Sequence, residues 1–166
     1  MAALYNSRDR RMQVVILVGL PGSGKSTFYA ERFAATHVHV SRDNFPNNRN
    51  PSRRQAMLLE EALVAGRDVV VDNTNLRAAD RAPIIEAARR HGATVIGYAF
   101  EPDVARCRER NRKRQGRARV PDVAIYTARR RLEPPSRAEG FDALIRVRAR
   151  DDRGFELDEV VETTER

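Results

Sequence analysis

The feature that most constrains this chain is the segment GLPGSGKS at residues 19–26, which follows an apolar run at residues 14–18. Glycines at this spacing let the backbone turn tightly, so that several N–H groups can converge on a phosphate. A helix that begins inside such a segment adds the positive end of its dipole. The segment therefore predicts a phosphate-binding loop for a nucleoside triphosphate.

Two side chains of this loop have distinct expected roles. Lys25 would reach the outer phosphates, and the hydroxyl of Ser26 would ligate Mg²⁺. The residues expected to surround the nucleotide phosphates are Gly19, Pro21, Gly22, Ser23, Gly24, Lys25, Ser26 and Thr27.

The length and composition indicate one globular domain. The chain has 166 residues, of which 41% are hydrophobic, and no apolar run approaches the length of a membrane span. Residues 1–12 lack the apolar core of a signal peptide, which predicts a cytoplasmic protein without a membrane partner. The single cysteine, Cys107, excludes an internal disulfide framework. His37, His39 and His91 lack metal-ligand spacing and are interpreted as strand or surface residues.

The charge balance is strongly basic, with a formal net charge of +8. A polyanionic partner and a solvated arginine-rich surface both fit this value. The distribution is more informative than the total, because arginines crowd between residues 106 and 119 with Glu109 as the one acid among them. Beyond Arg150 the chain is acidic.

Short β-rich runs alternate with longer helical patterns along the chain, which predicts an α/β fold. This fold is a parallel sheet of the P-loop NTPase type, with helices on both faces and an arginine-rich lid at about residues 108–120. We expect a leader at residues 1–12, a P-loop kinase domain at 13–148, and an acidic extension at 149–166 with room for a short strand at 155–157. The expected strands are 13–18, 37–41, 68–71, 94–100 and 143–147, and the expected helices are 25–35, 51–65, 78–91, 104–114 and 121–132.

Asp43 follows the second expected strand, at the edge of the sheet that also carries the phosphate loop. A carboxylate at this place can accept the proton of an attacking hydroxyl. The alternative is that Asp43 caps the next turn or pairs with Arg42, since aspartate is common in turns.

Asp72 follows the apolar run at residues 69–71 of the third expected strand. An aspartate in this position is typical of the acidic group that holds Mg²⁺ directly or through water in nucleotide sites. An Asx turn after a buried strand is the alternative, and we favour the metal role.

The arginine-rich segment has a specific interpretation beside a phosphate loop. Guanidinium groups that close over a migrating phosphoryl group stabilise the charge of its transition state. Gly116 gives the segment a place to bend. Most of these arginines fit a solvated helix face, and we expect one or two to touch nucleotide phosphates.

Four stretches taken together resemble the kinase domain of the 5′-hydroxyl polynucleotide kinases found in animal DNA-repair and phage RNA-repair enzymes. They are GLPGSGKSTF at 19–28, HVSRD at 39–43, VDNTN at 71–75, and RNRKR at 110–114 with VPD at 120–122. The sequence AEGF at 138–141 resembles the animal kinases in particular. The resemblance covers about residues 13–148.

This resemblance implies transfer of a phosphoryl group from ATP, with Mg²⁺, to the 5′-hydroxyl end of DNA or RNA, and repair proteins as partners. Lys25 and Asp43 would be catalytic, Asp43 as the general base, with Arg110 or Arg114 as the lid arginine and Asp72 as the metal-associated acid. The candidates for binding the acceptor are Arg42, Arg49, Arg53, Arg54, Asn73, Thr74 and Asn75.

The chain departs from the family pattern at one position. Phage-type relatives carry an acceptor-binding arginine three residues after the catalytic aspartate, where this chain has Pro46. Arg49, Arg53 or Arg54 would do this work from a nearby turn.

Two other functions fit the same motifs. A small-metabolite kinase of the gluconate or shikimate type shares the loop, the sheet and an arginine lid, but it needs a closed polar pocket. An ATP-dependent switch or antitoxin-like binding protein would use ATP to order the lid for a partner, without any need for Asp43 in turnover.

Overall fold

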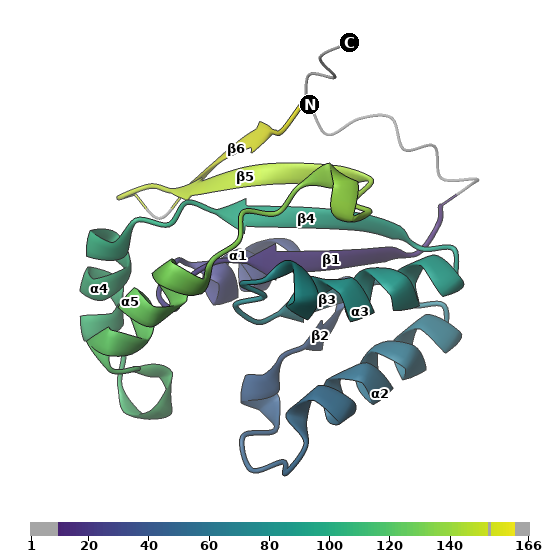
Figure 1. Cartoon of the computed structure of the whole chain (residues 1–166), viewed down its shortest axis with the longest axis horizontal. Coiled ribbons are helices and arrows are strands. Elements are labelled where there is room, and N and C mark those ends of the chain that lie inside the picture. Colours follow the sequence, from purple (N-terminus) through teal and green to yellow (C-terminus); the bar gives the residue numbers. More distant parts are fainter. Residues whose placement is uncertain (1–9, 153, 162–166) are drawn as a thin grey trace.

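The computed structural model describes residues 10–152 and 154–161, which form one sheet with helices around it (Figure 1). Five neighbouring strands of the sheet are parallel, and the last pairs antiparallel with β5, in the order β2-β3-β1-β4-β5-β6. The predicted α/β fold is thereby confirmed, with one antiparallel strand added. The strands are β1 (Gln13–Val18), β2 (Val38–Val40), β3 (Val69–Asp72), β4 (Thr94–Phe100), β5 (Ala143–Ala149) and β6 (Phe155–Glu159).

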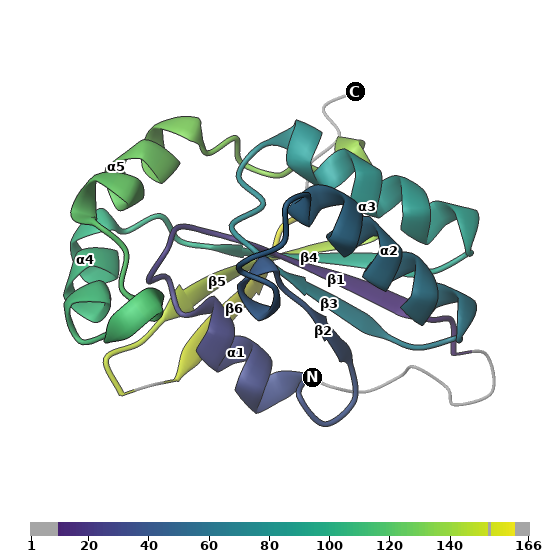
Figure 2. The same cartoon turned by 90° about the horizontal axis from the view of Figure 1, so that it is seen from below.

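Helices cover both faces of the sheet (Figure 2). Along β1, Val14 and Ile16 belong to the core shared with α2 and α3, whereas Val15 and Leu17 belong to the core shared with α1. Every one of these four side chains is fully buried, as expected for a central parallel strand. The helices are α1 (Lys25–Arg32), α2 (Pro51–Val64), α3 (Ala78–Arg90), α4 (Val104–Arg112) and α5 (Asp122–Arg131), and the short 3₁₀ turns are η1 (Arg42–Asn44), η2 (Gly116–Ala118) and η3 (Arg137–Glu139).

Helices α4 and α5 lie together beside the carboxyl end of β1, away from α2 and α3 (Figures 1 and 2). A third apolar cluster joins Leu20, which follows β1, to Cys107 of α4 and Ile125 of α5. All three side chains are no more than 1% exposed. The arginine-rich segment is therefore anchored on the loop that follows β1.

The end of the domain differs from the sequence-based expectation. β5 runs to Ala149, and Phe155 begins a sixth strand whose register pairs it with that residue. The ring of Phe155 packs against Phe28 of α1 at a centroid distance of 5.1 Å. Residues 155–159 are thus part of the sheet, because they pair with β5. The aromatic contact packs this strand against the core. Residues 162–166 lie outside the described part.

The beginning of the domain also differs. Residues 1–9 of the expected leader lie outside the described part, but Met12 packs against the core and its carbonyl accepts a hydrogen bond from Thr94. Arg10 forms an ion pair with Asp68. The packed chain therefore starts before β1.

Most elements begin and end within a few residues of the predicted bounds. α4 ends at Arg112 instead of residue 114, because the buried side chain of Asn111 hydrogen-bonds both backbone groups of Val120 and closes a loop over residues 112–119. Among the residues that the structure describes, no helix is both long and apolar enough to span a bilayer.

Candidate active site

The phosphate loop connects β1 to α1 and has the conformation that its glycines predict. Gly22 and Gly24 adopt backbone φ values of +80° and +100°, which residues other than glycine rarely adopt. A Cβ at Gly22 would lie 2.5 Å from the carbonyl oxygen of Cys107, so α4 leaves no room for one. Gly24 is the N-cap of α1 and gives no side-chain cap, and the first turn has no acid. The free N–H groups of this turn are available to a phosphate.

Lys25 lies inside the loop with 8% of its surface exposed. Its ammonium donates hydrogen bonds to the carbonyls of Gly19 at 3.0 Å and Leu20 at 2.8 Å. Burial lowers the pKa of Lys25 to about 8, and the charges of Asp72 and Asp43 oppose this shift. The lysine and both carboxylates are thus close enough to interact.

Asp72 is the last residue of β3 and pairs with Leu17 of β1, two residues before the phosphate loop begins at Gly19. Its carboxylate is nearly buried, with 6% of the residue exposed. One oxygen lies 2.9 Å from Nε2 of His39 on β2, and the His39 ring stacks on Tyr29 of α1 at 3.9 Å. Three elements therefore hold this side chain at the carboxyl edge of the sheet.

The segment after Asp72 binds the backbone of β1, of β3 and of the phosphate loop. The side-chain amide of Asn75 donates to the carbonyls of Leu17 at 2.8 Å and Val71 at 3.3 Å, and Asn75 has φ +45°. The backbone carbonyl of Thr74 accepts from Gly19 N–H. Asn75, which the sequence placed among acceptor-binding residues, is therefore committed to the scaffold beneath the phosphate loop.

Asn73 and Arg42 join β3 to the start of α2. The Asn73 carbonyl oxygen accepts from the Arg42 backbone N–H at 2.9 Å, and its amide donates to Gln55 at 2.7 Å. The Arg42 guanidinium donates to Gln55 at 3.1 Å and to Ser52 at 3.1 Å. Arg42 thus ties η1 to α2 and is not paired with Asp43. Thr74 is half-buried beside this network.

Asp43 lies in η1, directly after β2, and its side chain is exposed. The Ser41 hydroxyl accepts a hydrogen bond from the Asp43 backbone N–H at 3.3 Å and so caps this turn. Within residues 10–152 and 154–161, the Asp43 carboxylate makes no ion pair or side-chain hydrogen bond. It is therefore free to accept a proton.

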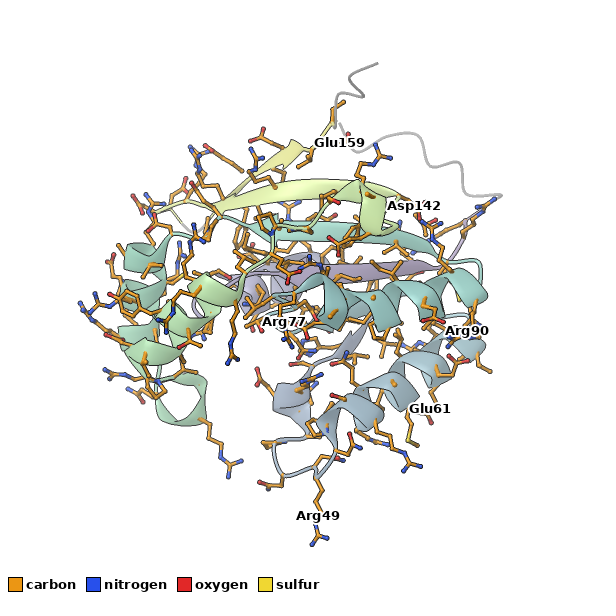
Figure 3. All side chains as sticks on the ribbon, in the orientation of Figure 1. Arg49, Glu61, Arg77, Arg90, Asp142 and Glu159 are labelled. Carbon is orange, nitrogen blue, oxygen red and sulfur yellow. The ribbon has the colours of Figure 1, made fainter. Side chains whose placement is uncertain are left out.

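Three exposed arginines surround the loop between η1 and α2. Arg49 extends from the tip of this loop into solvent (Figure 3), and Arg53 and Arg54 lie in the first turn of α2. None of the three is paired with an acid in the described part of the chain. They form the basic loop, the name used below for Arg49, Arg53 and Arg54.

The two predicted lid arginines lie next to the phosphate loop. Arg110 of α4 donates to the carbonyl of Gly22 at 3.4 Å. Arg114 donates to Ala118 at 3.4 Å, and its charge lowers the pKa of the buried Lys25 further. Both are half-buried, whereas Arg112, Arg117 and Arg119 are exposed.

A cavity of about 350 Å³ lies between the β5–β6 hairpin and α4, close to Gly24 of the phosphate loop. Ala149, one of its lining residues, lies 3.8 Å from the Cβ position of Gly24. The β5–β6 hairpin and Arg106 of α4 line it, and the sequence did not predict the pairing of these two strands. Its lining residues are Arg106, Arg148, Ala149, Arg150, Asp151, Asp152 and Glu156.

His39 is the other residue that the sequence did not single out. It was interpreted as a strand or surface residue, but its imidazole contacts the Asp72 carboxylate. The available signal was the order of the strands, since β2 lies beside β3 and pairs His39 with Val70. The two side chains therefore end neighbouring strands at one edge.

The residues present fit ATP with Mg²⁺. In the described part of the chain, no group of three or more His, Cys, Asp or Glu side chains could hold a metal ion by itself. Mg²⁺ usually needs only one or two protein ligands, because phosphates and waters supply the rest. The exposed Ser26 hydroxyl at the start of α1 and the Asp72 carboxylate are suitable ligands. The uncapped first turn of α1 suits the phosphates.

The chain is similar to proteins of two kinase classes. A protein of Acanthamoeba polyphaga mimivirus, provisionally named a bifunctional polynucleotide phosphatase/kinase, is 26% identical over 150 residues, which are 84% of this chain and 34% of that protein. The chain spans about a third of the length of the curated relatives that it matches.

Two solved structures show the same fold. A gluconokinase from Sinorhizobium meliloti 1021 superposes with a TM-score of 0.58 and 23% identity over 84% of each chain. A chain of the Pnkp1/Rnl/Hen1 RNA repair complex superposes with a TM-score of 0.60 and 25% identity over 78% of this chain and 47% of that one.

The family description "AAA domain" (AAA_33) matches residues 14–135, from the start of β1 to the segment after α5. This range contains the phosphate loop, Asp43, Asp72 and both lid arginines. The chain therefore belongs to the AAA_33 family, with a P-loop domain of the kinase type.

Proposed function

We propose that this protein is an ATP-dependent kinase that phosphorylates the 5′-hydroxyl end of a nucleic acid. The observation that carries this proposal is the exposed Asp43 carboxylate, which follows β2 at the edge of the sheet that carries the phosphate loop and has no partner in the described residues. An acceptor hydroxyl between this carboxylate and the phosphate loop would meet a base on one side and the phosphates of ATP on the other.

In the proposed reaction, Asp43 accepts the proton of the 5′-hydroxyl while the hydroxyl oxygen attacks the γ-phosphorus. The bond between that phosphorus and the β–γ bridging oxygen breaks, and ADP leaves with the electron pair. Lys25 and one of Arg110 and Arg114 stabilise the charge on the transferred group. Ser26 and Asp72 would hold Mg²⁺, which would neutralise phosphate charge when bound.

The basic loop supports a nucleic-acid acceptor. Its three arginines lie close to Asp43 along the chain and have no acidic partner among the described residues, so their charge is available to phosphates. They take the place of the acceptor-binding arginine that Pro46 excludes. Related proteins point the same way, since the mimivirus relative is named for polynucleotide phosphatase and kinase activities.

A sugar acid is the second candidate acceptor. The superposition with the gluconokinase includes 84% of this chain and 84% of the gluconokinase chain. A gluconate-type kinase would phosphorylate a small carboxylate substrate and would not need the basic loop. The two candidates therefore predict different products from ATP: a phosphorylated nucleic-acid end or a phosphorylated sugar acid.

The test is transfer of label from γ-labelled ATP to 5′-hydroxyl oligonucleotides of DNA and RNA, with gluconate and shikimate as the competing acceptors. We expect label on oligonucleotides only. Asp43→Asn should lower kcat by about 10²–10⁴-fold and leave ATP affinity unchanged, because a general base contributes that much. Asp158→Asn, on the exposed part of β6, is the matched control. Label on a sugar acid, or full transfer by Asp43→Asn, would reject the proposal.

A further inference from the structure

We infer that His39 is a positioning residue that fixes the Asp72 carboxylate and links it to the turn carrying Asp43. The inference rests on the nucleotide-binding half of the proposed function and is independent of which acceptor is used. His39 lies on β2, and its ring reaches across to the end of β3. It touches neither the phosphate loop nor any of the lid arginines through a hydrogen bond.

Both ring nitrogens of His39 have a partner. Nε2 lies 2.9 Å from Oδ2 of Asp72, and Nδ1 lies 3.4 Å from the side-chain amide nitrogen of Asn44. A carboxylate only accepts hydrogen bonds, so Nε2 carries a proton and donates it. The Asn44 side-chain amide lies within hydrogen-bond distance of Nδ1, so both ring nitrogens are held in place.

A single N–H donor is enough to orient the carboxylate. It holds one oxygen of Asp72 in place and leaves the other oxygen available to a cation. The imidazole therefore fixes the direction in which the free oxygen of Asp72 points.

The ring itself is held from two sides. The Tyr29 ring stacks on it with an interplanar angle of 15°. Asn44 belongs to η1, next to Asp43, so the same imidazole contacts the end of β3 and the turn that follows β2. A shift of the η1 turn is thereby coupled to the orientation of the Asp72 carboxylate.

The test measures binding of a non-hydrolysable ATP analogue, with Mg²⁺ and with EDTA. His39→Phe keeps a ring on Tyr29 and removes both hydrogen bonds. We expect the affinity for the analogue to fall about 10–100-fold in Mg²⁺, because residues that hydrogen-bond a metal ligand contribute that much. In EDTA the affinity for the analogue should change by less than about twofold. His39→Gln, whose amide nitrogen reaches the position of Nε2, should restore affinity to within about threefold.

Asn44→Ala removes only the Nδ1 partner from an exposed position and should shift Mg²⁺-dependent affinity by about threefold in the same direction. His91→Phe, which removes a surface histidine hydrogen-bonded to Glu60, should change neither measurement. An unchanged Mg²⁺ effect in His39→Phe, an equal loss with EDTA, or failure of glutamine to restore binding would overturn the inference. Since no acceptor is present, failure of the proposed function would leave this result intact.

Discussion

The two halves of the candidate site are built in opposite ways. On the nucleotide side, Lys25, Asp72 and Asn75 are all less than 9% exposed, and each is held by hydrogen bonds within the protein. On the acceptor side, Asp43 and Arg49 are exposed and have no ion pair with another described residue. One half is organised before any ligand binds, and the other is a surface of unopposed charge.

This difference matches what each half would bind under the proposed function. A triphosphate with Mg²⁺ is compact and highly charged, so donors fixed in advance stabilise it without reorganisation. A nucleic-acid end is extended and brings its own charges, so an open basic surface can attract it. The predictions below separate these two forms of construction.

The largest effect should come from Lys25→Met in the nucleotide half. It removes the one buried ammonium of the loop, and kcat/KM should fall by about 10³-fold or more. The nucleotide-free protein should nonetheless become more stable by about 1 kcal/mol, because burial of the charge opposes folding. Steady-state kinetics and thermal denaturation measure the two effects.

Lys113→Met is the matched control, because Lys113 is 77% exposed and pairs only loosely with Glu109 at 3.9 Å. It should change activity by less than twofold and stability by less than about 0.5 kcal/mol. A loss of stability in Lys25→Met would mean that the hydrogen bonds to the carbonyls of Gly19 and Leu20 outweigh the cost of burial.

The nucleotide half was largely predictable from sequence, whereas its support was not. The phosphate loop and Asp72 depend on local order along the chain, with glycines, a strand and a helix in sequence. His39 and Asn75 act through contacts between β2 and β3 and between β1 and β3, which no local pattern encodes. The short strand expected at 155–157 is present as β6, but its pairing with β5 was not predictable for the same reason.

The acceptor half should respond to Arg49→Gln, Arg53→Gln and Arg54→Gln combined. We expect KM for a 5′-hydroxyl oligonucleotide to rise about 30-fold at low salt. This estimate assigns about 0.7 kcal/mol of binding free energy to each of the three exposed charges. The dependence of KM on salt should become shallower, because fewer counterions are released. KM for ATP and the thermal midpoint should stay unchanged, since no other described residue pairs with these side chains.

A matched control for charge alone is Arg129→Gln, Arg130→Gln and Arg131→Gln, at the exposed end of α5. It removes the same charge from another place and should raise KM less than threefold. An equal rise from both triple variants would show that net charge, and not the basic loop, attracts the acceptor.

The smallest effect is the pH dependence of nucleotide binding. Burial lowers the pKa of Lys25 to about 8, so the amine is charged below pH 8 and neutral above it. A bound phosphate favours the charged form, so binding takes up a proton above pH 8 and affinity falls as pH rises. We expect a loss of about tenfold between pH 7 and pH 9, measured with metal-free ATP in EDTA. Lys25→Arg stays charged throughout this range and should bind ATP with the same affinity at both pH values. A fall in that variant as well would assign the pH dependence to another group, and the buried ammonium would then not be what distinguishes the nucleotide half.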